Sequence, residues 1–186
     1  MVTDDEQAGY LMLTGLLRLH GPVAAGQSIE LLAFSGTKTA PAAQLREQGL
    51  RRAWSSTSRC ACVIWSMAMQ AFQQSGRLLG KDVLFSAVNS SPAILQARLD
   101  GRLNTLVAGH STLGGWAMVL INDDTKGVNI DAHGGRDRQE ALFQLIDATQ
   151  AQRLLGPLAP VDFHALSAVG KPASYRYPFS LQLLLR

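Results

Sequence analysis

Two polar residues stand where ligand-binding chemistry is common in α/β proteins, shortly after predicted buried strands. Asn89 follows the apolar run at 83–88, and His110 follows the apolar run at 103–107. A helical segment at 92–99 separates the two runs, and the order strand, helix, strand indicates parallel pairing. Ligands of parallel α/β sheets bind just beyond the carboxyl ends of the strands. Asn89 and His110 are therefore candidate ligand-binding residues.

The sequence contains none of the motifs that commonly carry catalysis or metal binding. It lacks a G-x-S-x-G elbow, a Walker A loop, an H-E-x-x-H motif and a C-x-x-C pair. No two histidines have the spacing of metal ligands; the four are His20, His110, His133 and His164. Asp123 and Asp124 could form a metal or acid/base pair, but a solvated turn at a helix end is the favoured interpretation. We predict no enzymatic activity, no metal site and no cofactor.

Two pairs of small residues, one of cysteines and one of glycines, receive ordinary structural interpretations. Cys60 and Cys62 are one residue apart and would form a strained disulfide, so they are predicted to be buried thiols. Gly114 and Gly115 have no G-x-G-x-x-G pattern around them. The close approach of a helix to its neighbour explains these glycines as well as a phosphate-binding turn does.

Size and composition indicate a globular chain with a core of its own. The 186 residues are 47% hydrophobic and 17% charged, which argues against disorder. The net charge of +3 is modest and the basic residues are scattered, so we predict no nucleic-acid binding. No apolar run reaches the roughly 18 residues of a membrane span, so no membrane insertion is predicted. The acidic start of the chain does not fit a signal peptide.

The predicted elements alternate between helices and strands along most of the chain. Acidic residues 4–6 predict a helix start, and that helix is expected to end near residues 19–22. A second helix is predicted at 40–53, with Pro41 in its first turn. The other predictions are a strand at 28–35, a helix at 66–75, a strand–helix–strand–helix unit at 83–121, a strand at 142–146, a helix at 148–155 and an irregular tail. The predicted fold class is α/β, a parallel sheet with flanking helices.

Four segments together resemble a known family. They are DDEQAGYLMLTGLL at 4–17, LLAFSGTKTAPAAQLREQGLRRA at 31–53, the stretch at 66–121, and the remainder through YRYPFSLQLLL. The sequence resembles the LacI-type (type I) periplasmic sugar-binding proteins, the substrate-binding components of ABC transporters, and mainly their C-terminal lobe. The resemblance implies two α/β lobes that close over a small ligand, often a carbohydrate. It also implies a periplasmic location and a transporter permease as partner.

The resemblance assigns ligand contacts to individual residues. Arg46 in AAQLREQGL matches an arginine that commonly hydrogen-bonds the ligand, and its N–H donors suit adjacent sugar hydroxyls. An exposed helix arginine is the alternative interpretation. Asn89 matches a ligand-binding Asp or Asn, with Arg46 as its expected partner at the site, and a turn that caps the next helix explains it nearly as well. His110 is the weaker candidate, since a residue that leads into a helix needs no ligand.

The sequence departs from this family in two places. Residues 1–36 are predicted to be a remnant of the N-terminal lobe. Residues 37–186 are predicted to be the C-terminal lobe with an internal deletion near 53–65 and an irregular tail. With GC-rich codons, a one-base shift in 53–64 yields residues that the family has there. We hypothesise a frameshifted, internally deleted gene, which the nucleotide sequence tests.

We therefore interpret the chain as an incomplete sugar-binding component of an ABC transporter. The effector lobe of a LacI-type transcription regulator and a ligand-sensing partner of a membrane receptor are alternatives with the same fold. A small α/β enzyme is a third alternative. Without a signal peptide, the chain as written is expected in the cytoplasm, whereas the family is periplasmic. Half of a binding cleft predicts weak or absent sugar binding, and exposed sheet edges predict marginal stability.

Overall fold

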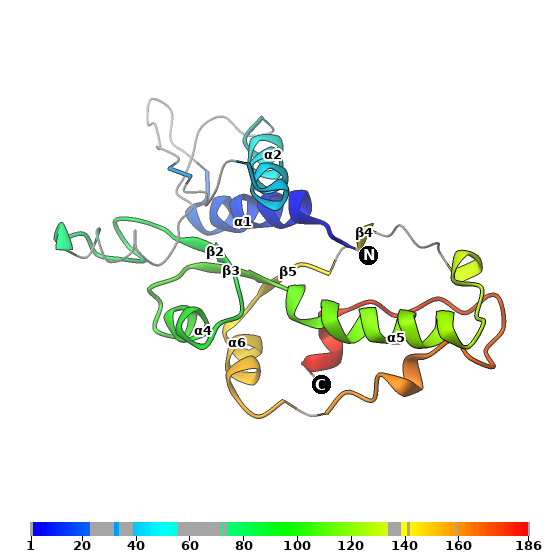
Figure 1. Cartoon of the computed structure of the whole chain (residues 1–186). Coiled ribbons are helices and arrows are strands. Elements are labelled where there is room, and N and C mark those ends of the chain that lie inside the picture. Colours follow the sequence, from blue (N-terminus) through cyan, green and yellow to red (C-terminus); the bar gives the residue numbers. More distant parts are fainter. Residues whose placement is uncertain are drawn as a thin grey trace.

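The computed structural model shows a layered α/β arrangement (Figure 1). It describes residues 2–22, 32–33, 39–55, 72, 74–133, 139–140, 142–158 and 160–185. The predicted strand at 28–35 and helix at 66–75 lie largely outside these residues. Cys60, Cys62 and most of the predicted deletion at 53–65 lie outside them as well.

A three-stranded sheet, in the order β2–β3–β5, forms the centre of the structure. β2 (Ser86–Val88) pairs in parallel with β3 (Thr105–Ala108), with Val88 opposite Val107. Helix α4 (Pro92–Leu99) makes the crossover that this parallel pair requires, and it has the predicted bounds. The predicted α/β fold with parallel pairing and flanking helices is confirmed.

The direction of β5 (Gln144–Ile146) differs from the prediction of a parallel sheet. β5 runs antiparallel to β3, with Leu106 opposite Ile146. Between the two strands the chain follows helix α5 (Leu113–Thr125), which extends away from the sheet instead of packing back across it (Figure 1). The chain therefore returns to the sheet from the edge at which β3 ends, and an antiparallel strand results.

A second, much smaller sheet lies apart from the first. β1 (Val2–Thr3) pairs in parallel with β4 (Gln139–Glu140), so each strand has two residues. Four short 3-10 helices complete the described elements: η1 (His110–Thr112), η2 (Ile130–His133), η3 (His164–Leu166) and η4 (Leu181–Leu184). Apart from η3 and η4, the described tail has no regular structure, as predicted.

Helix α1 (Asp5–His20) begins and ends where the sequence predicted. The side chain of Asp4 caps it by accepting a hydrogen bond from the Gln7 N–H at 2.8 Å. Gly21 ends it with φ of 74°, a conformation that favours glycine. Helix α2 (Pro41–Ser55) begins at a proline, which is tolerated there because the first N–H of a helix has no partner within it.

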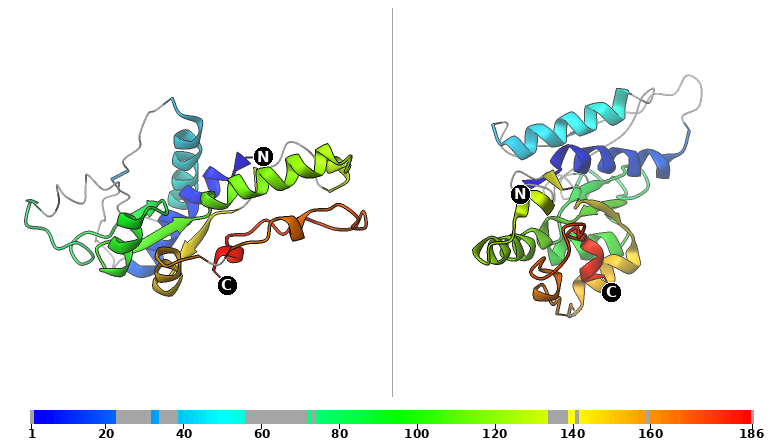
Figure 2. Two further views of the ribbon diagram at one scale, coloured as in Figure 1. Left: turned by 60° about the horizontal axis from the view of Figure 1, so that its bottom comes forward. Right: turned by 90° about the vertical axis from the view of Figure 1, so that its right-hand side faces the viewer.

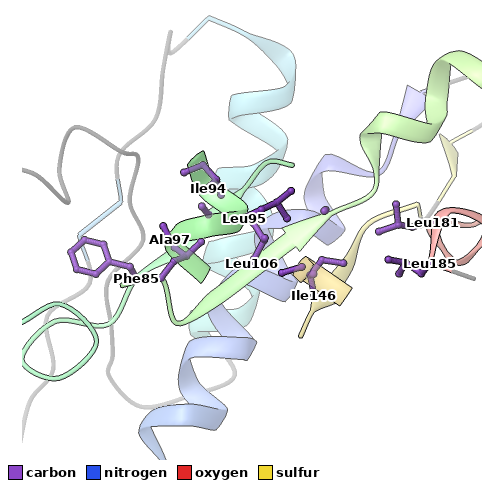
Figure 3. Close-up of a cluster of buried hydrophobic side chains, with 12 residues drawn as sticks. Phe85, Ile94, Leu95, Ala97, Leu106, Ile146, Leu181 and Leu185 are labelled. Carbon is purple, nitrogen blue, oxygen red and sulfur yellow. The ribbon is translucent and has the colours of Figure 1, made fainter. Parts of the chain in front are cut away.

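Helices cover both faces of the three-stranded sheet. On one face α4 and α6 (Ala148–Leu155) pack against β2, β3 and β5 around a cluster of buried apolar side chains. Figure 3 shows this cluster, which includes Phe85, Leu106 and Leu185. On the other face α1 lies against the sheet, and Leu13 and Leu16 pack with Val107. A parallel pair needs this cover because both of its faces are apolar. α2 packs on the outside of α1 (Figures 1 and 2).

A third apolar cluster joins α5 to the C-terminal tail. Trp116 is completely buried between Phe163 and Phe179, with ring centroids 5.7 Å and 4.7 Å away, both edge-to-face. Gly115 permits this packing, since a Cβ at Gly115 would lie 2.3 Å from the Phe163 ring. The expected close approach is thus confirmed for Gly115 but not for Gly114, which has open space around it.

Two glycines let α1 and α2 cross in backbone contact. A Cβ at Gly49 would lie 1.9 Å from the Glu6 carbonyl oxygen, and a Cβ at Gly9 would lie 2.0 Å from the Arg46 carbonyl oxygen. These distances are far shorter than any real contact, so a side chain at either position would push the helices apart. The predicted division of the chain at residue 36 stays a prediction. Helices α1 and α2 lie on either side of residue 36 and pack directly on each other.

The crossing yields a stability prediction. We expect Gly49→Ala to lower the free energy of unfolding by about 1–3 kcal/mol, because the added methyl group overpacks a backbone contact. Gly114→Ala is the matched control: it is also helical but faces open space, so helix propensity should raise stability by up to about 1 kcal/mol. Urea denaturation followed by circular dichroism measures both values. Equal effects of the two variants would contradict the described crossing.

Candidate functional site

The carboxyl ends of β2 and β3 meet at one edge of the sheet. The backbone N–H of Asn89, directly after β2, donates to the Val107 carbonyl oxygen at 3.1 Å. After β3 the chain passes through Gly109, where a Cβ would lie 2.1 Å from the Leu142 carbonyl oxygen. The two segments that leave the sheet are therefore adjacent, as the sequence predicted. This edge is where α/β sheets bind ligands.

Asn89 is half-buried, and its side chain is held by the turn in which it lies. Its Oδ1 accepts hydrogen bonds from the N–H groups of Ser90 at 2.7 Å and Ser91 at 3.0 Å. The interpretation of Asn89 as a turn residue before α4 is therefore confirmed, although Ser91 is the N-cap. Both bonds use the carbonyl oxygen and leave the side-chain NH2 without a partner among the described residues. Its role in ligand binding stays a prediction.

Arg46 is half-buried on α2 and forms an ion pair with α1. Its Nε donates to Oδ1 of Asp5 at 2.8 Å, and its Nη2 lies 2.6 Å from the same oxygen. Asp5 is only 7% exposed, and its Oδ2 accepts a hydrogen bond from the Thr3 hydroxyl at 3.0 Å. Arg46 is thus a partly exposed helix arginine that is held by Asp5, and its role in ligand binding stays a prediction. No described hydrogen bond or ion pair joins Arg46 to Asn89, which the sequence paired at the site.

Asp5 is the residue of this site that sequence reasoning missed. The sequence offered Asp4, Asp5 and Glu6 only as a group that favours the positive end of a helix. In the structure Asp4 caps α1, whereas Asp5 turns toward α2 and fixes the guanidinium of Arg46. The two partners are 41 residues apart in sequence, so no local pattern could have linked them.

His110 begins the 3-10 turn η1 directly after Gly109. Its backbone thus lies next to the edge at which β3 ends, in the predicted segment. Its side chain lies outside the described part of the structure, and its role in ligand binding stays a prediction. Among the described residues, no group of three or more His, Cys, Asp or Glu could hold a metal ion.

Asp123 corrects a prediction, because it is completely buried rather than part of a solvated turn. The Ser167 hydroxyl donates to its Oδ1, the Ala168 N–H to its Oδ2 at 2.6 Å, and the Tyr177 hydroxyl to the same oxygen at 2.8 Å. These donors all belong to the C-terminal tail. Asp123 therefore anchors the tail to α5, and its neighbour Asp124 is exposed.

The donors around Asp123 also set its charge. Burial raises the pKa of Asp123, but the hydrogen bonds donated to the carboxylate, first of all by Ser167, outweigh burial and hold the pKa below its usual value. Asp123 is thus a structural carboxylate.

This layered unit, with an amide donor at the carboxyl ends of parallel strands and a guanidinium donor on α2, is typical of α/β ligand-binding folds. A solved periplasmic sugar-binding protein from Pseudomonas fluorescens is 48% identical to the chain, with a TM-score of 0.89. The match covers 100% of this chain and 69% of that protein. The chain belongs to the periplasmic sugar-binding proteins.

More distant structures share the fold. A galactofuranose binding protein is 18% identical with a TM-score of 0.64, and the match covers 82% of this chain and 62% of that protein. The binding protein of the arabinose ABC transporter from Shewanella sp. ANA-3 is 19% identical with a TM-score of 0.62, over 81% and 59%. The chain therefore spans about 60% of these two proteins. No protein-family model and no curated protein matches the chain.

One finding bears on membrane association. Within the described part of the chain, no helix combines the length and the apolar character needed to cross a membrane.

The buried carboxylate yields a prediction about pH. We expect Asp123→Asn to lower the free energy of unfolding by about 2–4 kcal/mol near neutral pH, because an NH2 group, which cannot accept, replaces one of the two oxygens that accept buried hydrogen bonds. The folded-state pKa is depressed, so this contribution is fully present above the unfolded-state pKa of about 3.9 and is lost as pH falls through the folded-state value. Urea denaturation at a series of pH values measures it.

The matched control is Asp131→Asn, at an exposed aspartate of η2. We expect it to change stability by no more than about 0.5 kcal/mol, as surface substitutions do. If Asp131→Asn and Asp123→Asn had the same effect at neutral pH, the anchoring role of Asp123 would be refuted.

Proposed function

We propose that the chain binds a small carbohydrate as part of the substrate-binding component of an ABC transporter, and that it catalyses no reaction. The observation that carries the proposal is the 48% identity, over the whole chain, to a periplasmic sugar-binding protein. Two of the more distant structures hold bound sugars, arabinofuranose in one and D-allose in the other. The proposed location of the full-length protein is the periplasm, and its proposed partner is a transporter permease.

The chemistry of Asn89 and Arg46 supports this proposal. Sugar hydroxyls both donate and accept hydrogen bonds, so a site for them needs oriented polar groups. The Asn89 carbonyl is held by two N–H groups, which fixes the direction of its NH2 donors. Asp5 binds the Nε side of the Arg46 guanidinium, and the side chain of Arg46 remains 33% exposed. Both groups are thus held in place before any ligand arrives, which lowers the entropy cost of binding.

The proposal includes only one side of a binding site. Sites for small molecules bury most of the ligand surface, and the chain spans 69% of its P. fluorescens relative. One side of such a site offers fewer contacts, so we expect affinity for a free monosaccharide to be weak, with a dissociation constant of about 1 mM or higher.

Titration of the isotopically labelled chain with a panel of pentoses and hexoses, followed by NMR, tests the proposal. We expect at least one sugar to shift the side-chain signals of Arg46 and Asn89 at millimolar concentrations. Arg46→Ala and Asn89→Ala should each weaken binding by roughly tenfold, the loss of one good hydrogen bond.

The matched control is Arg102→Ala. Arg102 pairs with Asp100 just before β3 starts, so it lies at the end of β3 opposite to the candidate site. Binding should be unchanged in this variant. Absence of any shift with every sugar would refute carbohydrate binding by the chain, and micromolar affinity would refute the idea of a one-sided site.

A further inference from the structure

The ion pair between Arg46 and Asp5 uses only one side of the guanidinium. Asp5 Oδ1 lies 2.8 Å from Nε and 2.6 Å from Nη2 of Arg46. Among the described residues, none accepts a hydrogen bond from Nη1, and 33% of the Arg46 side chain is exposed. A guanidinium has five N–H donors in a planar fork. Arg46 therefore keeps donors for a ligand, although its charge is already paired.

Asp5 is the more deeply buried partner of this ion pair. It is 7% exposed, and its second oxygen, Oδ2, accepts a hydrogen bond from the Thr3 hydroxyl at 3.0 Å. Charges that are shielded from water interact more strongly than charges on the surface, because the effective dielectric constant is lower. The Asp5 carboxylate therefore offsets the charge of Arg46, and it repels any second carboxylate that approaches the free side of the guanidinium.

The other charges of α2 do not restore a positive field around Arg46. Arg52 Nη1 lies 2.6 Å from a carboxylate oxygen of Glu6, and Arg51 Nη2 lies 2.6 Å from one of Glu47. All three arginines of α2 are thus paired with carboxylates. Asp4, which caps α1, adds a further negative charge. Within the described residues, α2 and the start of α1 together carry no excess of positive charge.

We propose that Asp5 determines which carbohydrates the site accepts: it offsets the charge of Arg46, and so selects uncharged sugars over sugars that carry a carboxylate, such as uronic acids. The inference rests on the proposed function, since it concerns the ligand of the same site. Sugar hydroxyls need hydrogen-bond donors but no net charge. A sugar carboxylate, in contrast, gains most from an unpaired guanidinium, with which it forms a bidentate ion pair. Asp5 acts through Arg46, so it is a positioning residue.

Two pairs of sugars that differ only in charge at C6 test the inference: galactose with galacturonate, and glucose with glucuronate. The isotopically labelled full chain is titrated with each sugar at neutral pH and low salt, and NMR follows the Arg46 Nε–H signal. We expect the unaltered chain to bind the uncharged member of a pair at least about tenfold more tightly than the uronate, because like charges repel at the site.

Asp5→Asn removes the charge but keeps the size of the side chain and an oxygen that can accept from Arg46. We expect this variant to bind the uronate roughly tenfold more tightly than the unaltered chain does, since the guanidinium then has no charged partner. Arg46→Gln in the Asp5→Asn background should abolish that gain. The matched control is Glu47→Gln, which removes the same charge from the exposed pair with Arg51. It should change the preference between the two sugars by no more than about twofold.

The proposal is overturned if the unaltered chain binds a uronate as tightly as the matching hexose. It is also overturned if Asp5→Asn, folded by circular dichroism, leaves the preference unchanged, or if Glu47→Gln changes it equally. If Asp5→Asn does not fold, the titrations of the unaltered chain decide alone. If neither hexose binds the unaltered chain, the proposed function fails for hexoses. The uronate titration of Asp5→Asn then still shows, through the Arg46 signal, whether Asp5 prevents carboxylate binding.

Discussion

The parallel pairing of β2 with β3 is the constraint on which the rest of the structure depends. A parallel pair cannot be closed by a tight turn, so the chain must cross one face of the sheet, and α4 does so. Both faces of such a pair are apolar, so the opposite face needs cover as well, and α1 provides it. The pairing also brings Asn89 beside the end of β3. The order of the layers and the position of Asn89 therefore both follow from the pairing of β2, which has three residues, with β3, which has four.

Much of this arrangement could be predicted from local sequence signals. Helices α4 and α6 have the predicted bounds, because Pro92 starts one and an Asp147–Gln150 capping box starts the other. The strands were predicted from apolar runs, but such a run carries no information about direction. The antiparallel direction of β5 could therefore not be predicted without knowing where α5 leads the chain.

The errors concern polar groups whose partners are distant in sequence. Asp123 stands in the polar stretch Asn-Asp-Asp-Thr, which is typical of a solvated turn. Its burial depends on Ser167 and Tyr177, which are 44 and 54 residues further along. A carboxylate can be buried only when donors satisfy it, and no local pattern reveals donors supplied by an irregular tail.

Arg46 shows how packing and the proposed binding chemistry are connected in this fold. Asp5 and Gly9 are four residues apart, so they occupy one side of α1, the side that faces α2. At Gly9 the missing Cβ makes room for the backbone of Arg46, whose Cα would lie 2.9 Å from that Cβ. At Asp5 the carboxylate holds the guanidinium of the same residue.

α1 therefore fixes both ends of Arg46, its backbone through a close approach and its side chain through an ion pair. A group held at two points loses little conformational freedom when it binds a ligand. The glycine is thus as important for the candidate site as the charged partner, although it carries no chemistry of its own. A side chain at Gly9 would separate the helices and move Arg46 relative to the strand edge, even if every polar residue were retained.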